Sequence, residues 1–205
     1  MYSLRLVKAS DAAALTEIYR PFVISDDLSI STVSFEYDAP DAEEFGNRIA
    51  AISQEFPYLV MLENDVPVGY AYAHPFIERA AYQWGAEVTI YLAPAGQGKG
   101  LGVVLYAALE DLLRLQNVIH LYSCVTSSNE HSVGMHKRMG YKIIGRFAET
   151  GFKKGVWLDM VWLEKTIALI PKVPELRKSF SSIDSDQVET VLAKYNKLLA
   201  EAKRL

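Results

Sequence analysis

Hydrophobic and polar positions follow two periods along the chain, one typical of strands and one typical of helices. Alternating or β-rich runs predict strands at 2–7, 58–62, 68–73, 86–92, 121–126, 141–147 and 156–163. Apolar residues spaced three or four apart predict helices at 11–19, 40–52, 100–116 and 131–139. Strands and helices mix without strict βαβ alternation, which favours an α+β domain with a mixed sheet.

Capping residues, prolines and turn residues suggest where several elements begin and end. Ser10 is placed to cap the first helix, and Pro21 is expected to stop it. Residues 26–37 are rich in Ser and Asp and are expected to be irregular. Residues 63–65, Glu-Asn-Asp, lie between two β-rich runs and predict a hairpin turn.

The last forty residues differ from the rest in composition and pattern. We therefore divide the chain into a domain at 1–165 and an extension at 166–205. Two prolines break the start of the extension, and residues 179–182 resemble a linker. Asp184 and Gln187 are spaced as a capping box for a final amphipathic helix. Its apolar face is expected to pack on the domain or on a second subunit, and a homodimer is expected. This face carries Val188, Val191, Leu192, Tyr195, Leu198 and Leu199.

Composition narrows the functional classes. The formal net charge of -4 over 205 residues gives no reason to expect a nucleic-acid partner. No apolar run approaches membrane-spanning length, and a single cysteine excludes an internal disulfide. We therefore expect a cytoplasmic protein with no membrane association. The apolar neighbours of Cys124 predict a small buried filler and not a reactive thiol.

The most informative segment is residues 90–102, where a strand leads through a glycine-rich turn into a helix. Free N–H groups at a helix start suit a phosphate, and glycines let the backbone approach it closely. The spacing excludes a Walker A loop, because Lys99 is followed by glycine, and it excludes the dinucleotide fingerprint G-x-G-x-x-G. It fits Gln97-x-x-Gly100-x-Gly102, which resembles the acetyl-CoA loop of Gcn5-related acetyltransferases (GNAT).

The resemblance continues on both sides of the loop and covers residues 2 to about 165. It is closest to the branch that acetylates phosphinothricin and methionine sulfoximine. The matching segments are Thr32 to Glu36, Ala81 to Leu92, Asn129 to Tyr141, and Gly155-x-Trp157-x-Asp159. The resemblance implies the GNAT acyl-CoA N-acyltransferase fold, a mixed antiparallel and parallel sheet flanked by helices. It implies acetyl transfer from acetyl-CoA to the primary amine of a small molecule, an amino acid or an analogue, without a metal.

The resemblance also implies which residues hold acetyl-CoA. Main-chain groups of the strand before the loop would bind the pantetheine arm, and the loop itself would bind the pyrophosphate. Asn129 would reach the pantetheine arm from the next segment, a role compatible with capping the helix that follows it. The expected cofactor-binding residues are Ile90, Tyr91, Leu92, Gln97, Gly98, Lys99, Gly100, Leu101, Gly102 and Asn129.

Two residues match catalytic positions of the family. Glu87 matches the general base, and partial burial between apolar neighbours would raise its pKa toward a useful value. His136 stands where many members place a tyrosine that protonates the leaving thiolate, and imidazole suits that task near neutral pH. Without the resemblance, periodicity favours an exposed strand glutamate at Glu87. The alternative for His136 is a surface histidine on an amphipathic helix.

The acceptor side rests on partial matches. The expected substrate-binding residues are Phe35, Glu36, Arg79, Ala80 and Tyr82. Ile77 stands where an arginine is common in the branch, a departure that bears on acceptor specificity. Trp84 and Trp157 are further candidates for the pocket wall, with the core as the alternative.

Other functions fit the same cofactor loop. The acceptor is alternatively a polyamine, an aminoglycoside or a protein N-terminus. A non-catalytic acetyl-CoA-binding module is a third possibility, against which the presence of both Glu87 and His136 argues.

Overall fold

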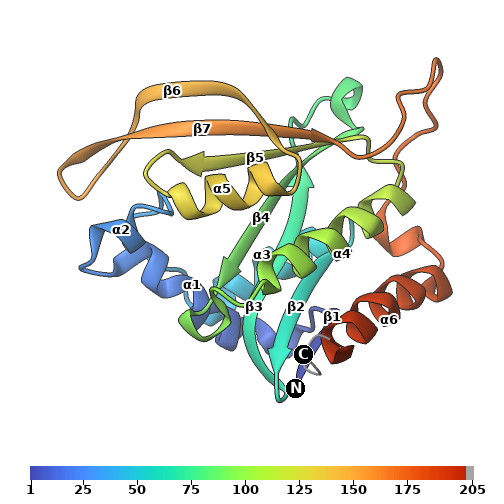
Figure 1. Ribbon diagram of the computed structural model, residues 1–205, viewed down its shortest axis with the longest axis horizontal. Coiled ribbons are helices and arrows are strands. Elements are labelled where there is room, and N and C mark those ends of the chain that lie inside the picture. The colour runs from blue at the N-terminus through green and yellow to red at the C-terminus, as the bar shows by residue number, and fades with distance from the viewer. Residues whose placement is uncertain (202–205) are drawn as a thin grey trace.

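A seven-stranded sheet forms the centre of the computed structural model, which describes residues 1–201 (Figure 1). The strand order is β1-β2-β3-β4-β5-β7-β6, and only β4 and β5 run parallel. The predicted mixed sheet is confirmed. The strands are β1 (Tyr2–Leu6), β2 (Tyr58–Glu63), β3 (Val66–Pro75), β4 (Gly85–Leu92), β5 (His120–Thr126), β6 (Lys142–Lys153) and β7 (Val156–Thr166).

Helices cover both faces of the sheet around β2 and β3. Tyr58, Val60 and Leu62 pack against α1 and α3, while Leu59 and Met61 pack in the core that contains α4. Burial on both faces explains why β2 is apolar from Tyr58 to Leu62 and does not alternate between apolar and polar residues. The helices are α1 (Ala12–Ile24), α2 (Leu28–Ser31), α3 (Ala42–Ser53), α4 (Leu101–Leu115), α5 (Glu130–Arg138) and α6 (Ser185–Glu201). Short 3₁₀ turns are η1 (Ala9–Asp11), η2 (Ala80–Tyr82), η3 (Pro94–Gly96) and η4 (Phe180–Ser182).

The first helix differs from its prediction at both ends. Pro21 lies inside α1, which continues to Ile24, so the predicted stop is wrong. Proline removes one helical hydrogen bond, but Val23 beyond it is fully buried in the core. At the other end Asp11, and not Ser10, organises the helix start. Its carboxylate accepts the Lys8 N–H at 2.7 Å and pairs with Arg5.

The segment expected to be irregular contains the single-turn helix α2. The Asp27 carboxylate caps this turn by accepting the Ser29 N–H at 2.9 Å. The predicted turn at 63–65 is confirmed: Asn64 and Asp65 have φ of 50° and 66°, as a tight hairpin between β2 and β3 requires. The final strand pair is longer than predicted, because β6 and β7 form one extended hairpin.

Strands β4 and β5 separate part-way along their length. They pair only from Gly85 to Glu87 on β4 and from His120 to Tyr122 on β5. Beyond Glu87, β4 remains paired with β3 on its other side as far as Leu92. The splayed half of β4 therefore presents main-chain groups toward a gap in the sheet, as the family resemblance implied.

The extension packs back on the domain through α6, which lies beside β1 and α4 (Figure 1). Val188, Leu192, Tyr195 and Leu199 join the core that contains α4. The Asn196 side chain accepts the Leu4 N–H at 2.7 Å and donates to the Leu4 carbonyl at 2.9 Å, so it satisfies the outer edge of β1. Within residues 1–201 no helix has the length and apolar character needed to cross a membrane.

The contribution of α6 to stability can be measured on two leucines of this helix. We expect Leu192→Ala to lower the free energy of unfolding by about 2–4 kcal/mol, because Leu192 is 5% exposed and its truncation leaves a cavity. Leu198→Ala is the matched control, since Leu198 is 47% exposed, and its expected cost is below about 1 kcal/mol. Urea unfolding measures both values, and equal costs would place α6 outside the cooperative core.

Candidate active site

The glycine-rich loop leaves the end of β4, forms η3 and enters α4. Gly98 and Gly100 have φ of 71° and 75°, and Gly100 is the N-cap of α4. These left-handed conformations explain the glycines at both positions. The Gln97 side chain donates to the Leu92 carbonyl at 2.9 Å, which ties the loop to the strand it leaves. The N–H groups of the first turn of α4 are therefore held at the edge of the splayed strand.

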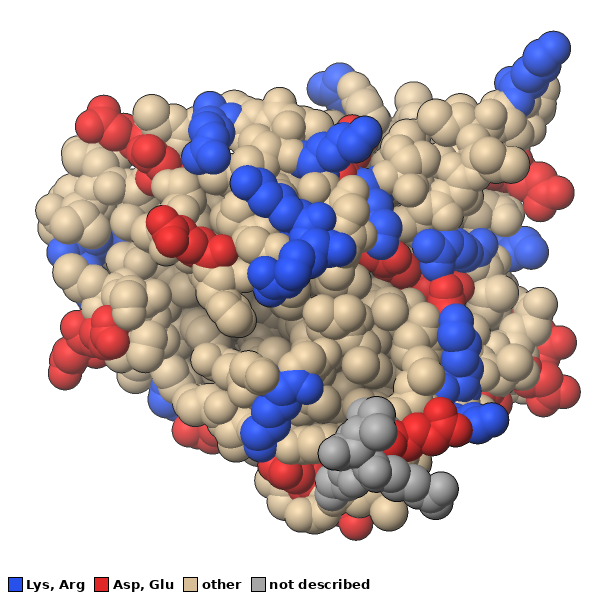
Figure 2. Space-filling model, viewed as in Figure 1, with Lys and Arg blue, Asp and Glu red and all other residues tan. Residues whose placement is uncertain are grey.

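A groove of about 540 Å³ lies at this loop, and we call it the loop groove. Figure 2 shows a hollow on this face of the molecule, with Lys and Arg side chains at its rim. The groove lies between the start of α4, α5, the splayed part of β4 and the end of α1. Its lining includes Phe22, Ile90, Tyr91, Leu92, Gln97, Gly98, Gly100, Leu101, Gly102, Asn129, Met135 and Arg138.

The positive charges near the loop are not arranged as the sequence suggested. Lys99 points away from the groove: its ammonium donates to the Tyr2 hydroxyl at 2.9 Å and lies 3.9 Å from the Glu63 carboxylate. Arg138, at the end of α5, lines the groove instead. The arginine that lines the groove therefore comes from α5 and not from the loop.

A second cavity, of about 520 Å³, adjoins the loop groove, and we call it the Glu87 cavity. The two share five lining residues: Val33, Ile90, Tyr91, Asn129 and Ser132. The Glu87 cavity lies over the point where β4 and β5 separate. Its remaining lining includes Tyr19, Ser34, Phe35, Glu36, Tyr72, Glu87, Thr89, Tyr106, Ser123, Cys124, His136 and Met160. A ligand held in the loop groove would thus reach the Glu87 cavity at the splay.

Glu87 is a half-buried carboxylate at the last position of β4 that pairs with β5. Its side chain is 21% exposed, and His74 on β3 lies directly opposite in the sheet. Burial raises the pKa of the Glu87 carboxyl, and the charge of a protonated His74 opposes that rise. A carboxylate in these surroundings holds a proton more firmly than an exposed one, as a general base for an amine requires.

His136 lines the same cavity but is almost wholly buried, with 1% of its surface exposed. Its Nδ1 donates to the Ser132 carbonyl at 2.8 Å, and Nε2 has no hydrogen-bond partner among the described residues. Burial lowers the pKa of His136, so the ring is mainly neutral at pH 7. A neutral ring that donates from Nδ1 presents a lone pair on Nε2, and it must take up a proton there before it can donate one.

Asn129 has the double position that the sequence suggested. Its side-chain oxygen accepts the Ser132 N–H at 3.1 Å and so caps α5. The same residue lines both the loop groove and the Glu87 cavity. Capping and ligand contact are therefore compatible at this position.

Phe35 and Glu36 form part of the wall of the Glu87 cavity, carried by the segment that follows α2. Glu36 accepts two hydrogen bonds from Arg48 of α3, at 2.7 and 3.1 Å. Ser34 is held by the Tyr19 hydroxyl at 2.6 Å. The predicted acceptor wall is thus anchored to both α1 and α3.

The tip of the β6–β7 hairpin holds this wall from the opposite side. Lys153 is only 2% exposed, and its ammonium donates to the carbonyls of Ser31 and Ser34 at 2.6 and 2.7 Å. Burial lowers the pKa of Lys153. A Cβ atom at Gly151 would come within 2.2 Å of the Phe35 ring, so the hairpin and the wall are in close contact. A buried ammonium is costly unless it is hydrogen-bonded. The two bonds from Lys153 therefore hold the hairpin and the acceptor wall in one arrangement.

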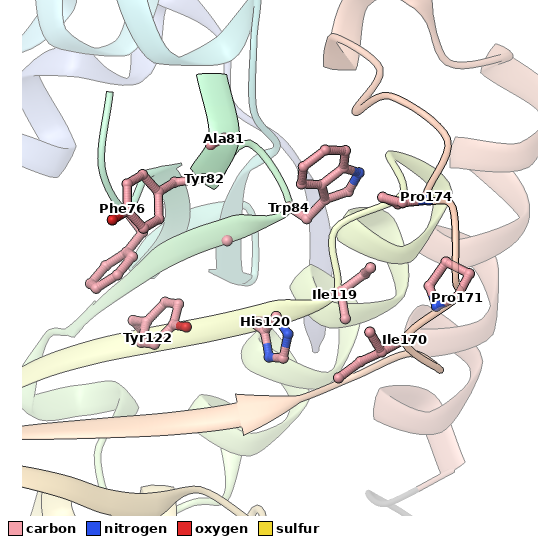
Figure 3. A pocket seen from close by; sticks show the side chains of 11 residues that line it. Phe76, Ala81, Tyr82, Trp84, Ile119, His120, Tyr122, Ile170, Pro171 and Pro174 are labelled. Carbon is pink, nitrogen blue, oxygen red and sulfur yellow. The ribbon is translucent and has the colours of Figure 1, made fainter. Parts of the chain in front are cut away.

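Three predicted acceptor residues do not reach the Glu87 cavity. Arg79, Ala80 and Tyr82 lie on the β3–β4 connection, where η2 exposes all three. Tyr82 lines a separate cavity of about 200 Å³. Figure 3 shows it beside Phe76 there, with Trp84 and the prolines of the extension at the other side of the view. The chain by itself therefore brings Phe35 and Glu36 to Glu87, but not the residues of the β3–β4 connection.

Cys124 is a lining residue and not a fully buried filler. It is partly exposed to the Glu87 cavity, because the splay of β4 uncovers this part of β5. Burial and the charge of Glu87 raise the pKa of the Cys124 thiol to about 12. The thiol is therefore protonated at neutral pH, in agreement with the expected lack of reactivity.

Sequence reasoning missed Arg138, Arg48 and Lys153. Arg138 follows the matched His136 by two positions, so the motif contained it. Arg48 is spaced four residues from Glu44 on a predicted helix, and it also binds that carboxylate, at 2.5 Å. Nothing local marks Lys153 as buried, because its partners lie about 120 positions earlier in the chain.

Comparison with known proteins shows the family of the chain. The family model described as an acetyltransferase (GNAT) domain matches residues 4–162. A phosphinothricin N-acetyltransferase of Alcaligenes faecalis is 32% identical, over 80% of this chain and 82% of its own. An L-methionine sulfoximine/L-methionine sulfone acetyltransferase of Salmonella typhimurium is 28% identical, over 79% and 92%. The solved structure of a phosphinothricin acetyltransferase from Sinorhizobium meliloti in complex with AcCoA has a TM-score of 0.75 at 28% identity, covering 90% of this chain and 96% of that one.

The chain therefore belongs to the GNAT acetyltransferase family, and the resemblance inferred from its sequence is confirmed. The mixed sheet flanked by helices is the fold of this family.

Proposed function

We propose that the chain transfers an acetyl group from acetyl-CoA to the primary amine of a small molecule, with Glu87 as general base. One observation carries the proposal. The loop groove and the Glu87 cavity meet where β4 separates from β5, so a long ligand in the groove would end beside the carboxylate. Positioning of this kind can lower the barrier of a two-substrate transfer by about 7–11 kcal/mol.

The lining of the loop groove fits acetyl-CoA. The N-terminus of α4, with Gly98, Gly100 and Gly102, would hold the pyrophosphate, and Arg138 would add positive charge. Main-chain groups of Ile90 to Leu92 would bind the pantetheine amides, with Asn129 on the opposite side. A relative solved with AcCoA supports this assignment.

The groups in the Glu87 cavity would divide the proton transfers between them. The raised pKa of Glu87 suits removal of a proton from the acceptor ammonium. His136 remains our candidate for the proton of the leaving thiolate. Because its Nε2 carries a lone pair, it would take the second amine proton and pass it to sulfur.

The names of the relatives favour an amino acid or an amino-acid analogue as acceptor. A polyamine or an aminoglycoside is the second candidate. It is favoured by Glu36 and Glu87, two carboxylates that line the same cavity and would attract a cationic acceptor.

Release of free thiol from acetyl-CoA tests the proposal directly. The acceptor panel contains methionine sulfoximine, phosphinothricin, methionine, a polyamine and an aminoglycoside. We expect turnover with at least one amino acid of the panel. Calorimetric binding of acetyl-CoA without turnover on any amine would instead support a binding module.

The attachment of the acceptor wall gives a further prediction. Lys153→Met leaves the Ser31 and Ser34 carbonyls without their donor, so the wall is expected to loosen and the KM for the acceptor to rise about tenfold. The Kd for acetyl-CoA is expected to stay within about threefold, because Lys153 does not line the loop groove. Lys142→Met, on an exposed lysine of the same strand, is the control. Equal acceptor KM values for the two variants would contradict this role.

We also propose a homodimer and a cytoplasmic location, where acetyl-CoA is available. Sedimentation velocity of the purified chain tests the first, and fractionation of the source cells tests the second.

A further inference from the structure

A histidine stands beside the proposed base, outside the lining of the Glu87 cavity. His74 is paired with Glu87 across β3 and β4, and its Nε2 lies 4.0 Å from Glu87 Oε2. Directly opposed residues of an antiparallel pair point to the same face of the sheet. The His74 side chain is 35% exposed and does not line the cavity, while Glu87 is 21% exposed and does. His74 thus adjoins the base and is itself in contact with solvent.

The hydrogen bond on the far side of the ring fixes how His74 faces Glu87. Its Nδ1 lies 3.0 Å from the Pro75 carbonyl, and a carbonyl only accepts, so Nδ1 carries the hydrogen. In the neutral ring, Nε2 therefore presents a lone pair toward the carboxylate. A separation of 4.0 Å is longer than a direct hydrogen bond, so proton transfer between the two groups would pass through a water molecule.

We propose that His74 relays protons from Glu87 to solvent and so resets the base after each turnover. The proposal rests on the proposed function, in which Glu87 removes a proton from the acceptor. That proton passes from the ammonium to Glu87, then to His74 Nε2, then to water. The amine nitrogen forms a bond to the acetyl carbon, and the carbon–sulfur bond breaks with its electron pair on sulfur. The second amine proton goes to that sulfur, so one proton per turnover leaves through His74.

The surroundings of Glu87 leave His74 as its charge partner. Tyr72 on β3 has its pKa raised by burial, and the Cys124 thiol on β5 has a pKa of about 12, so both stay neutral at pH 7. Tyr122 is opposite Glu87 on β5, and Tyr106 approaches from α4; burial raises the pKa of both.

The cavity is also lined by Glu36, which is bound by Arg48, and by His136, whose pKa is lowered by burial so that the ring stays neutral at pH 7. Among the described residues around Glu87, His74 is thus the imidazole that is also exposed to solvent.

The direction in which removal of the imidazole shifts the pKa of Glu87 follows from the causes of that shift. Burial raises the pKa of Glu87 and protonated His74 lowers it, so without His74 the pKa rises further. The base form exists above that pKa. The acidic limb of kcat/KM for the acceptor should therefore move to higher pH in His74→Ala, by about half a unit or more. The plateau should also fall about tenfold, because the relay is lost, and added imidazole should restore it.

A second variant separates the charge of His74 from its proton transfer. His74→Lys keeps a cation beside Glu87, so it should return the acidic limb to the wild-type pH or below, without restoring the plateau. His120→Ala is the control, because His120 is a half-exposed histidine 3.6 Å from another carboxylate, Glu164, outside the cavity. Its profile should match that of the wild type. A His74→Ala profile that matches the wild type, or a plateau that imidazole leaves unchanged, would overturn the relay.

Titration of the Glu87 carboxyl by carbon-13 NMR gives a test that needs no turnover. The midpoint should rise in His74→Ala and stay unchanged in His120→Ala. An unchanged midpoint in His74→Ala overturns the coupling even if the wild-type protein acetylates amines. Absence of turnover in the wild-type protein, with a shifted midpoint, would count against the proposed function and leave the pairing of the two residues established.

Discussion

Gly100→Asp is expected to lower the affinity for acetyl-CoA by at least about a hundredfold, which corresponds to about 2.8 kcal/mol. Gly100 caps α4 and lines the loop groove, so a carboxylate there would occupy the N–H groups proposed for the pyrophosphate and repel its charge. A Cβ atom at this position meets no other atom within 4 Å, so the cost to the fold comes from the φ of 75° and not from a steric clash. Isothermal titration calorimetry measures the affinity.

Two controls separate charge from backbone strain. Gly155→Asp is matched to Gly100→Asp, because Gly155 has a φ of 80° and equally open surroundings, but it lies in the β6–β7 turn. Its affinity should match that of the wild type. Gly100→Asn has nearly the same shape as Gly100→Asp without the charge and should lose less. The difference between these two Gly100 variants should shrink as salt is added. An affinity within threefold of the wild type for Gly100→Asp would remove the loop from the cofactor site.

Glu87→Gln is expected to lower kcat by about a hundredfold or more, the usual range for loss of a general base. The amide keeps the size of the side chain but cannot take a proton. Because Glu87 lies outside the lining of the loop groove, the Kd for acetyl-CoA should change by less than about threefold. Steady-state kinetics and calorimetry together measure this separation.

The pH profile gives the same prediction a second readout. Burial raises the pKa of Glu87, so the wild-type kcat/KM should fall as the pH drops through that raised value. Glu87→Gln has no group to protonate there, and this limb should disappear. Glu78→Gln, at an exposed glutamate of the β3–β4 connection, should keep the limb and the wild-type kcat. A Glu87→Gln enzyme with more than half of the wild-type kcat would exclude the residue from the mechanism.

Local patterns predicted most elements because their cause is local. The β2–β3 hairpin follows from β-rich runs around Asn64 and Asp65, whose side chains tolerate a left-handed turn. The start of α4 follows from the glycines that lead into an amphipathic repeat. Pro21 was the main failure. A proline weakens one helical bond, but the burial of Val23 beyond it outweighs that loss, and burial is a tertiary property.

Within the site, the sequence by itself determined the loop, the carboxylate and their order along the chain. The positions of the glycines around Lys99 excluded two other phosphate loops, and Gln97, Gly100 and Gly102 fitted the acetyl-CoA loop. Glu87 was identified through the family resemblance, on the strand that precedes that loop. Such features are determined locally, because one strand and one turn position all of them.

Only the tertiary structure decided which charges face the site. Lys99 belongs to the loop but turns away to Tyr2, while Arg138 reaches the groove from α5. Lys153 donates hydrogen bonds to carbonyls about 120 positions earlier in the chain. The register of β3 and β4 places His74 opposite Glu87. Sequence spacing sets which backbone positions are neighbours within an element. Packing between elements decides which partner the end of a long side chain reaches. No local sequence pattern could therefore predict these contacts.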